Sequence, residues 1–153
     1  MEHPEPGYAL LRFAGDRMVT GDPGQFVMVR GDWGTDPLLP RAFSLVETGE
    51  KGAILVRVVG KGTRALSTMG PGDELGVLGP AGRGFSPLET GRRPVLVAGG
   101  VGVAPLLFLA EQFASEGVSP LFIYGAKSAA DLPLCSRAEK SGECIVTTED
   151  GSR

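Results

Sequence analysis

The stretch that decides the fold is RRPVLVAGGVGVAPLLFLAEQF, residues 92–113 of the chain. Its apolar residues 95–98 suit a strand that is buried on both faces of a parallel sheet, and a leucine-rich helical pattern follows Pro105. Between the two lie three glycines, Gly99, Gly100 and Gly102. Without side chains, they let a bulky anion approach the free N–H groups at the start of the helix. The stretch predicts a strand, a glycine turn and a helix, and the turn suits either a phosphate site or a plain tight turn.

After this stretch the sequence alternates between helix and strand patterns. Ser128, three residues before Asp131, looks like the start of a capping box for the second helix. Such alternation predicts right-handed βαβ units and a parallel sheet. Three parallel strands make only a small unit, so we expect residues 94–153 to be the N-terminal half of an α/β nucleotide-binding domain. The expected elements are strand 95–98, helix 105–115, strand 121–125, a helix near 131–140 and strand 143–147.

Before the stretch the sequence is of β type. Short strand-like runs are separated by turns rich in Gly, Asp and Pro, at the spacing of a small antiparallel barrel or sandwich. We expect this first domain to cover residues 1–88, with the polar, proline-terminated segment 89–94 as the boundary. The runs lie at 8–13, 26–30, 42–46, 53–59 and 74–78.

The composition narrows the class of protein. The chain has 153 residues, 42% of them hydrophobic, and a formal net charge of −3. This charge, without any run of basic residues, argues against a nucleic-acid partner. No apolar segment approaches the ~20 residues that cross a bilayer and no signal-peptide pattern is found, so we expect a cytoplasmic protein. Cys135 and Cys144 have neither a disulfide pattern nor the spacing of a metal site.

Two segments of the first domain could carry chemistry. The segment RAFS, residues 41–44, places a cation and an aromatic ring on one face of a strand and a hydroxyl on the other. Alone, this pattern is more typical of an edge strand with an exposed arginine. Downstream, Gly62 and Thr63 open a short helix whose free N–H groups form a second candidate anion site. Two phosphate-capable turns in two domains suggest two bound nucleotides.

In their order, the motifs resemble those of the ferredoxin-reductase superfamily, in which a flavin-binding barrel precedes a nicotinamide-nucleotide domain. Within it, the chain is most similar to the electron-transfer subunits of two-subunit, NADH-dependent dihydroorotate dehydrogenases. The likeness covers nearly the whole chain. It rests on five segments, Pro23–Val27, Arg41–Ser44, Gly60–Thr63, Gly79–Phe85 and Val97–Gly102.

The resemblance implies a set of cofactor contacts. Arg41 would pair with the pyrophosphate of FAD, Phe43 would pack beside the flavin, and Ser44 would hydrogen-bond near its reactive nitrogen. Ala42 stands where the family usually has proline, which loosens the turn without removing a contact. The other implied contacts are Leu55, Val56 and Arg57 at the isoalloxazine, Gly62 and Thr63 at the pyrophosphate, and Gly99, Gly100 and Gly102 at NADH.

Other features of the family are missing from this sequence. The family has an additional strand before the Tyr8 region, the rest of the nicotinamide domain after residue 153, and a cysteine-rich tail that holds a [2Fe-2S] cluster. Such a cluster needs four thiolates, and this chain has two cysteines. The sequence therefore resembles a form of the subunit that is truncated at both ends.

The hypothesis that follows is an electron-transfer flavoprotein subunit of pyrimidine biosynthesis. It would accept hydride from NADH on FAD and pass electrons through an iron–sulfur cluster to the FMN-containing catalytic subunit of a hetero-oligomer. No side chain is expected to act as acid, base or nucleophile, and the chain alone is expected to be inactive. The alternatives are another reductase subunit of the superfamily, such as a sulfide dehydrogenase or an NADH-dependent ferredoxin:NADP oxidoreductase, and a non-catalytic barrel module.

Some residues keep two interpretations. Glu149 and Asp150 follow the third parallel strand and suit either surface acids or contacts to a nucleotide ribose. Trp33 lies among glycines and acids and suits either a loop cover or a partner contact. His3 lies in a polar segment without a nucleophile or carboxylate motif around it, so we expect it to be structural.

Overall fold

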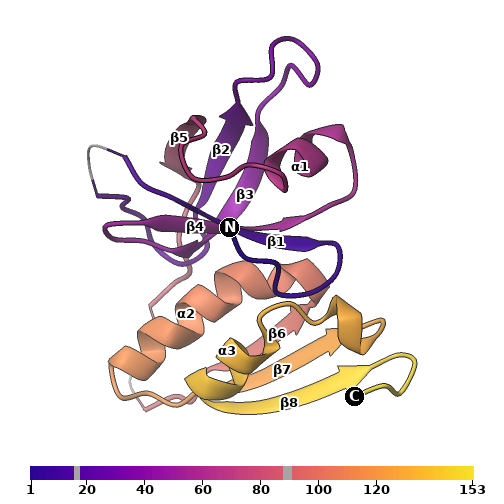
Figure 1. Ribbon diagram of the computed structural model, residues 1–153. Coiled ribbons are helices and arrows are strands. Elements are labelled where there is room, and N and C mark those ends of the chain that lie inside the picture. Colours follow the sequence, from indigo (N-terminus) through magenta and orange to yellow (C-terminus); the bar gives the residue numbers. More distant parts are fainter. Residues whose placement is uncertain (16–17, 88–90) are drawn as a thin grey trace.

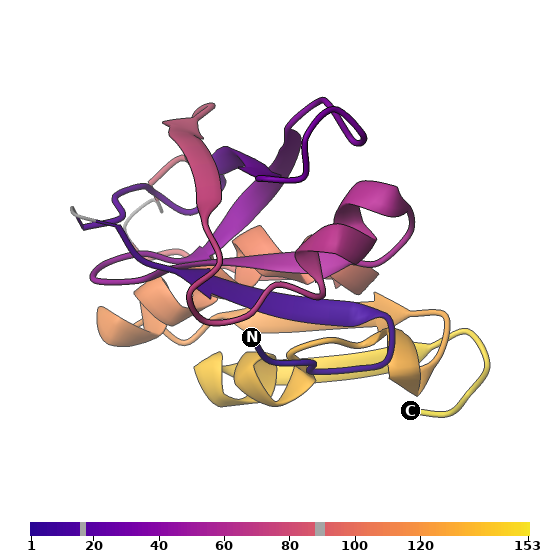
Figure 2. The ribbon, with the colours of Figure 1, turned by 45° about the horizontal axis from the view of Figure 1, so that its top comes forward.

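The computed structural model describes residues 1–15, 18–87 and 91–153. Two β-sheets form two layers, and helix α2 lies between them (Figure 1, Figure 2). The first layer contains β1 (Tyr8–Phe13), β2 (Phe26–Gly31), β3 (Arg41–Glu47), β4 (Gly52–Arg57), α1 (Lys61–Leu66) and β5 (Leu75–Ala81). The second contains β6 (Val95–Gly99), the 3-10 turn η1 (Gly100–Gly102), α2 (Val103–Ser115), β7 (Leu121–Ala126), the 3-10 turn η2 (Ala129–Asp131), α3 (Cys135–Ser141) and β8 (Glu143–Thr148).

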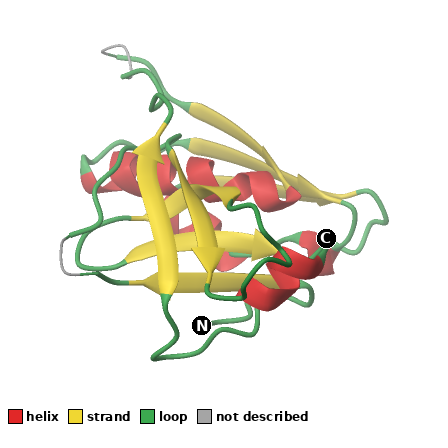
Figure 3. Ribbon diagram, turned by 90° about the horizontal axis from the view of Figure 1, so that it is seen from above, coloured by secondary structure: helices red, strands yellow, loops and turns green. Residues whose placement is uncertain are grey.

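The first sheet is antiparallel with the strand order β1-β4-β3-β2-β5. Figure 3 shows how its strands change direction across the sheet. In the described part of the chain β1 and β5 are edges that do not pair with each other, so the predicted barrel is open. Strand β4 is buried on both faces, because Ile54 and Val56 lie in the core of this sheet and Ala53 and Leu55 in the core shared with α2.

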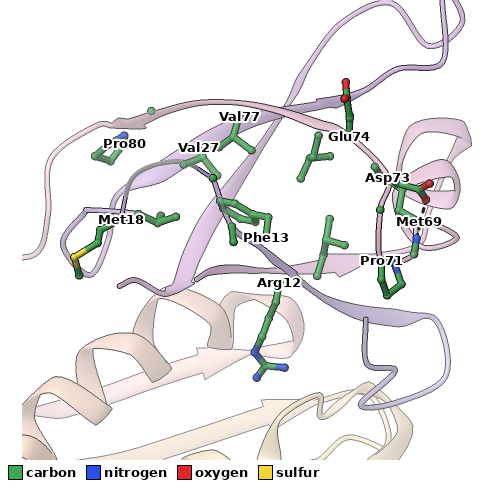
Figure 4. Close-up of a pocket in the computed structure, with 18 of the residues that line it drawn as sticks. Arg12, Phe13, Met18, Val27, Met69, Pro71, Asp73, Glu74, Val77 and Pro80 are labelled. Carbon is green, nitrogen blue, oxygen red and sulfur yellow. Dashed lines mark hydrogen bonds between the residues drawn. The ribbon is translucent and has the colours of Figure 1, made fainter. Parts of the chain in front are cut away.

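The opening between β1 and β5 is a cavity of about 880 Å³ (Figure 4). Phe13 and Met18 line it on one side and Val77 on the other. On the outer edge of β1, Leu10 exchanges two backbone hydrogen bonds with Glu2, at 2.8 and 3.1 Å. The free edge of β1 can therefore pair with an antiparallel segment, as it does at Glu2. The cavity leaves room for such a segment between β1 and β5.

The second sheet is parallel with the order β6-β7-β8, as the alternation of patterns predicts. On one face, Leu96 and Phe122 share a core with α2, α3 and the first sheet. On the other face, Val97, Ile123 and Ile145 lie side by side across the three strands. Val97 is 66% exposed and Ile145 is 50% exposed, so the helices of the described residues cover one face of this sheet only.

The predicted strands are confirmed to within three residues, but the second predicted helix was wrong in its extent. The segment near 131–140 divides into η2 and α3, because Pro133 interrupts the helix and Leu134 has a positive φ of 62°. The capping box was also wrong. The Ser128 hydroxyl donates to the Asp131 carboxylate at 3.0 Å and makes no side-chain cap to a backbone amide. Residues 89 and 90 of the predicted boundary lie outside the described residues.

Charged side chains join the two layers. Arg12 of β1 donates to both carboxylate oxygens of Glu47, each at 3.0 Å. Arg137 of α3 donates to Glu47 at 2.6 Å and to the two carboxylate oxygens of Glu111 on α2 at 2.9 and 2.7 Å. Burial alone would raise the pKa of Glu47, but hydrogen bonds from Arg12 and the charge of Arg137 outweigh it and lower this pKa. The network fixes the first sheet against the two helices of the second layer.

Candidate functional site

The first candidate site lies where the start of β3 meets the start of α1. The guanidinium group of Arg41 rests against the backbone of Gly62, since a Cβ atom at Gly62 would lie 2.0 Å from Arg41 Cζ. Arg41 Nη1 also donates to the carbonyl oxygen of Leu39 at 2.7 Å. Only glycine leaves room for this contact, so the structure brings together two site residues that the sequence separates. We call Arg41, Gly62 and Thr63 the Arg41 cradle.

The first turn of α1 supplies backbone donors to the cradle. The first intrahelical bond runs from the Arg64 N–H to the carbonyl of Gly60 at 2.9 Å, so the amides of residues 61–63 have no intrahelical acceptor. The Thr63 hydroxyl accepts from the N–H groups of Val59 and Gly60 at 2.9 and 3.0 Å and fixes the turn. A guanidinium beside the positive end of a helix is unfavourable alone, and an anion between them removes the repulsion.

The neighbours of Arg41 on β3 differ in exposure. Ala42 is exposed, while Phe43 is half-buried and packs against the core of the first sheet. Ser44 is half-buried and pairs with Phe26 of β2. The segment therefore carries ring, hydroxyl and cation along one strand.

The three implied contacts on β4 are not equivalent. As whole residues, Leu55 and Val56 are 3% and 0% exposed, so neither their side chains nor their backbone atoms are open to a ligand. The side chain of Arg57 is 48% exposed and points away from both cores. Of these residues, Arg57 alone presents a polar side chain.

The second candidate site is a cavity of about 490 Å³ at the carboxyl ends of β6, β7 and β8. We call it the strand-end cavity. Gly99 and Gly100 lie in its floor, and Tyr8 and Arg57 of the first sheet form the opposite wall. Gly102 is not among the residues that line it. Cβ atoms at Gly99 and Gly102 would meet no atom within 4 Å, so both glycines face open space.

Asp131 is a residue of this cavity that the sequence interpretation missed, because its pattern predicted a local cap. Its carboxylate accepts from the Tyr8 hydroxyl at 3.4 Å and lies 3.7 Å from Arg57 Nη2. The guanidinium of Arg57 also lies over the Tyr8 ring, 5.9 Å from its centroid. Burial raises the pKa of Tyr8; the charge of Arg57 opposes this rise and Asp131 adds to it. No local signal marks these contacts.

The two predicted acids behave differently. Glu149 lines the strand-end cavity together with Lys127. Asp150 does not line it, because its carboxylate accepts from the side chain and the backbone N–H of Ser152, which lowers its pKa. Of the two, only Glu149 is placed to meet a ligand there.

The glycine turn itself is held by a buried tyrosine. The Tyr124 hydroxyl is within hydrogen-bond distance of the carbonyl oxygens of Gly100, at 3.2 Å, and Pro133, at 2.9 Å. Tyr124 has no exposed surface, and burial raises its pKa strongly, so the hydroxyl stays a donor. It therefore ties the turn after β6 to the segment before α3.

Neither candidate site includes Trp33 or the two cysteines. Trp33 lies against Gly31, where a Cβ would come within 2.5 Å of its ring, and Trp33 Nε1 donates to Pro37 at 2.7 Å. Cys135 and Cys144 are free thiols in α3 and β8. Within the described residues there is no group of three or more potential metal ligands. Nor does any helix in that part of the chain have the length and apolar character to span a membrane.

Several curated relatives of the chain carry the same name. The dihydroorotate dehydrogenase B (NAD(+)) electron transfer subunit of Desulforamulus reducens is 41% identical over 135 residues, which is 85% of this chain and 51% of that protein. The subunit of Caldanaerobacter subterraneus is 44% identical over 132 residues, which is 85% of this chain and 50% of that protein. The chain thus spans about half the length of the curated relatives it matches. No protein-family model matches it.

Solved structures agree with this relationship. An NADH-dependent reduced ferredoxin-NADP oxidoreductase matches 97% of this chain and 54% of its own with a TM-score of 0.83 and 26% identity. Phthalate dioxygenase reductase matches 98% of this chain and 50% of its own with a TM-score of 0.79, and at 20% identity it supports the fold alone. The chain therefore has the ferredoxin-reductase-like two-domain fold and is homologous to about half of the electron transfer subunit of dihydroorotate dehydrogenase B.

Proposed function

We propose that this chain is the FAD- and NADH-binding part of a cytoplasmic electron-transfer subunit that serves a dihydroorotate dehydrogenase catalytic subunit. One observation carries the proposal. Arg57 at the end of β4 forms a wall of the strand-end cavity, and five residues later Gly62 meets Arg41 in the cradle. The short turn from β4 into α1 thus links the candidate nicotinamide site to the candidate flavin site, as hydride transfer between two nucleotides requires.

The residues of the cradle fit the pyrophosphate of FAD. A guanidinium binds phosphate oxygens in a bidentate manner, and the first-turn amides of α1 add neutral donors. The space that a Cβ at Gly62 would fill is taken by Arg41, so the cation is already positioned for an anion. Bound FAD would supply the acceptor for a hydride and release electrons singly, while the protein binds and orients it.

The strand-end cavity supports a nicotinamide nucleotide. Ligands of parallel α/β sheets bind outside the carboxyl ends of the strands, where Gly99 and Gly100 leave the backbone open. Glu149 would accept a hydrogen bond from the ribose 2′-hydroxyl and repel a 2′-phosphate, although Lys127 in the same lining favours the phosphate. We propose NADH as the donor, and rates of flavin reduction by NADH and NADPH test this choice.

The iron–sulfur cluster of the proposed pathway does not fit these residues. Two cysteines cannot supply four thiolates, and burial raises the pKa of both thiols. Transfer through a cluster to an FMN-containing partner is therefore proposed for the complete subunit. The isolated chain is expected to bind no iron and to be inactive toward that partner.

Flavin binding by the purified chain tests the proposal. Arg41→Ala should weaken FAD binding by about 1.5–3 kcal/mol, the size of a charge-assisted hydrogen-bond pair, and Gly62→Ala should weaken it because its Cβ displaces Arg41. Arg64→Ala, an exposed cation of the same helix, is the matched control. Equal affinities in Arg41→Ala and Arg64→Ala would remove the cradle from the site. A colourless chain that binds no FAD would favour the barrel interaction module.

A second reductase function has one specific observation in its favour. The match to the NADH-dependent reduced ferredoxin-NADP oxidoreductase covers 97% of this chain, more than the 85% covered by the first dihydroorotate dehydrogenase B relatives. Its sequence identity of 26% is lower than their 41%, and we therefore prefer the dihydroorotate assignment. Copurification with a dihydroorotate-oxidising subunit would distinguish the two, and so would dependence on ferredoxin.

A further inference from the structure

Charged side chains of both signs line the strand-end cavity. They are two cations, Arg57 and Lys127, and two carboxylates, Asp131 and Glu149. A nicotinamide dinucleotide brings two phosphate groups, so a lining that attracts it by charge alone would be cationic. The two carboxylates cancel that charge, and the proposed function gives a role to Glu149 only.

The carboxylate of Asp131 is surrounded by three donors of the kind that bind phosphate. Its Oδ1 atom accepts from the Tyr8 hydroxyl at 3.4 Å and lies 3.7 Å from Arg57 Nη2. Its Oδ2 atom accepts from the Ser128 hydroxyl at 3.0 Å. Hydroxyl groups and a guanidinium also suit a phosphate group, and the guanidinium suits it best. Asp131 therefore occupies donors that an anionic ligand could use.

Asp131 also lies beside the glycine turn that would receive the nucleotide. A Cβ atom at Gly100 would lie 3.9 Å from the carbonyl oxygen of Asp131 and 3.9 Å from the Tyr8 hydroxyl. Gly100 and Arg57 line the same cavity. A phosphate bound over this turn would therefore compete with Asp131 for the guanidinium of Arg57.

The contact between Asp131 and Arg57 is open to exchange. The side chain of Arg57 is 48% exposed and that of Asp131 is 29% exposed, so water reaches both charges. Arg57 has a second support, because its Cζ atom lies 5.9 Å from the centroid of the Tyr8 ring. The guanidinium can therefore exchange a carboxylate for a phosphate without leaving the wall of the cavity.

We propose that Asp131 is an internal competitor of the nucleotide, whose carboxylate holds Arg57 until a phosphate group of the nucleotide replaces it. The inference rests on the proposed function, since it takes the strand-end cavity to be the nicotinamide-nucleotide site. Its consequence is weaker binding of the nucleotide. Weaker binding suits a subunit that must exchange its nucleotide after every hydride transfer.

The test measures binding of ADP-ribose to the purified chain by calorimetry. This probe carries both phosphates of NADH but lacks the nicotinamide ring, so it does not reduce a flavin. Asp131→Asn keeps the shape of the side chain and should tighten binding about threefold to tenfold at low ionic strength. The gain should shrink in high salt, which screens charges. Asp150→Asn is the control for net charge, because Asp150 is an exposed carboxylate at the same sheet edge and does not line the cavity.

A second variant separates competition for Arg57 from simple repulsion of the ligand. Arg57→Gln should weaken binding of ADP-ribose, and adding Asp131→Asn to it should recover little affinity, since no guanidinium is left to release. A full gain in the Arg57→Gln background would overturn the inference, because Asp131 would then act on the ligand without Arg57.

The other outcomes separate the inference from the proposed function. Unchanged or weaker binding in Asp131→Asn would overturn the inference and leave the nucleotide site in place. The same holds for an equal gain in Asp150→Asn and for a gain that high salt does not reduce. Failure of both the wild-type chain and Asp131→Asn to bind ADP-ribose would refute the proposed nucleotide site, and the inference with it.

Discussion

Glu47 is the residue whose substitution should most clearly weaken the contact between the two layers. Its carboxylate receives hydrogen bonds from Arg12 of the first sheet and Arg137 of the second layer, and its side chain is 26% exposed. Glu47→Gln removes the charge between two guanidinium groups and keeps the shape. A half-buried pair of this kind lies between an exposed ion pair, about 0.2–1 kcal/mol, and a buried one, about 3–5 kcal/mol. We therefore expect a loss of about 2 kcal/mol in the free energy of unfolding.

Urea unfolding and thermal unfolding measure this loss. For a chain of this size, about 2 kcal/mol corresponds to a fall of about 4–8 °C in Tm. Glu50→Gln is the matched control, because Glu50 is an exposed carboxylate three residues further along the chain. Equal stability of the Glu47 and Glu50 variants would refute the role of the network.

The pH dependence gives a second check with a definite sign. The folded-state pKa of Glu47 is lowered below its ordinary value of 4.5. Its contribution is therefore complete above the unfolded pKa and is lost as the pH falls through the folded pKa. The difference in unfolding free energy between wild type and Glu47→Gln should be constant near neutral pH and shrink below about pH 4.5. A difference that stays constant through this acid range would show that the charge of Glu47 contributes nothing.

Three further outcomes follow from buried contacts. Gly142→Ala would place a Cβ 2.5 Å from a backbone oxygen and should lower the free energy of unfolding in urea by about 1–3 kcal/mol. Gly70→Ala, whose Cβ meets open space, should lower it by less than about 1 kcal/mol, and equal losses would contradict the clash. Tyr124→Phe removes a buried donor from two carbonyl oxygens and should cost about 1–2 kcal/mol by the same measurement, and an unchanged stability would argue against it. Burial raises the pKa of the Cys135 and Cys144 thiols, so iodoacetamide should alkylate them more slowly in the folded chain than in urea at the same pH. Equal alkylation rates would contradict this expectation.

Local patterns predicted the elements, because periodicity and turn residues act over a few positions. The strand at 95–98, the glycine turn and the helix after it are observed as β6, η1 and α2, and α2 begins two residues earlier than predicted. Burial on both faces was harder to predict. Leu55 and Val56 were assigned to a ligand by resemblance, yet their side chains fill two different cores, since β4 lies between the first sheet's own core and α2.

The relation between the two candidate sites could not be predicted from such patterns. The local spacing of Ser128 and Asp131 predicted a cap, but Asp131 pairs with Tyr8, 123 residues away, and lies beside Arg57 on another layer. Arg41 and Gly62 are likewise joined by the packing of β3 against α1; no local pattern pairs them, and only the resemblance, which places both at the FAD pyrophosphate, implied that they meet. In the folded chain a polar side chain bonds to the partners that the tertiary structure brings near. A partner that is close in sequence then has no energetic advantage over one that is distant in sequence. For this reason the resemblance could assign individual residues to cofactors, while the wall that Tyr8, Arg57 and Asp131 form between the two sites emerged only from the packing of one layer on the other.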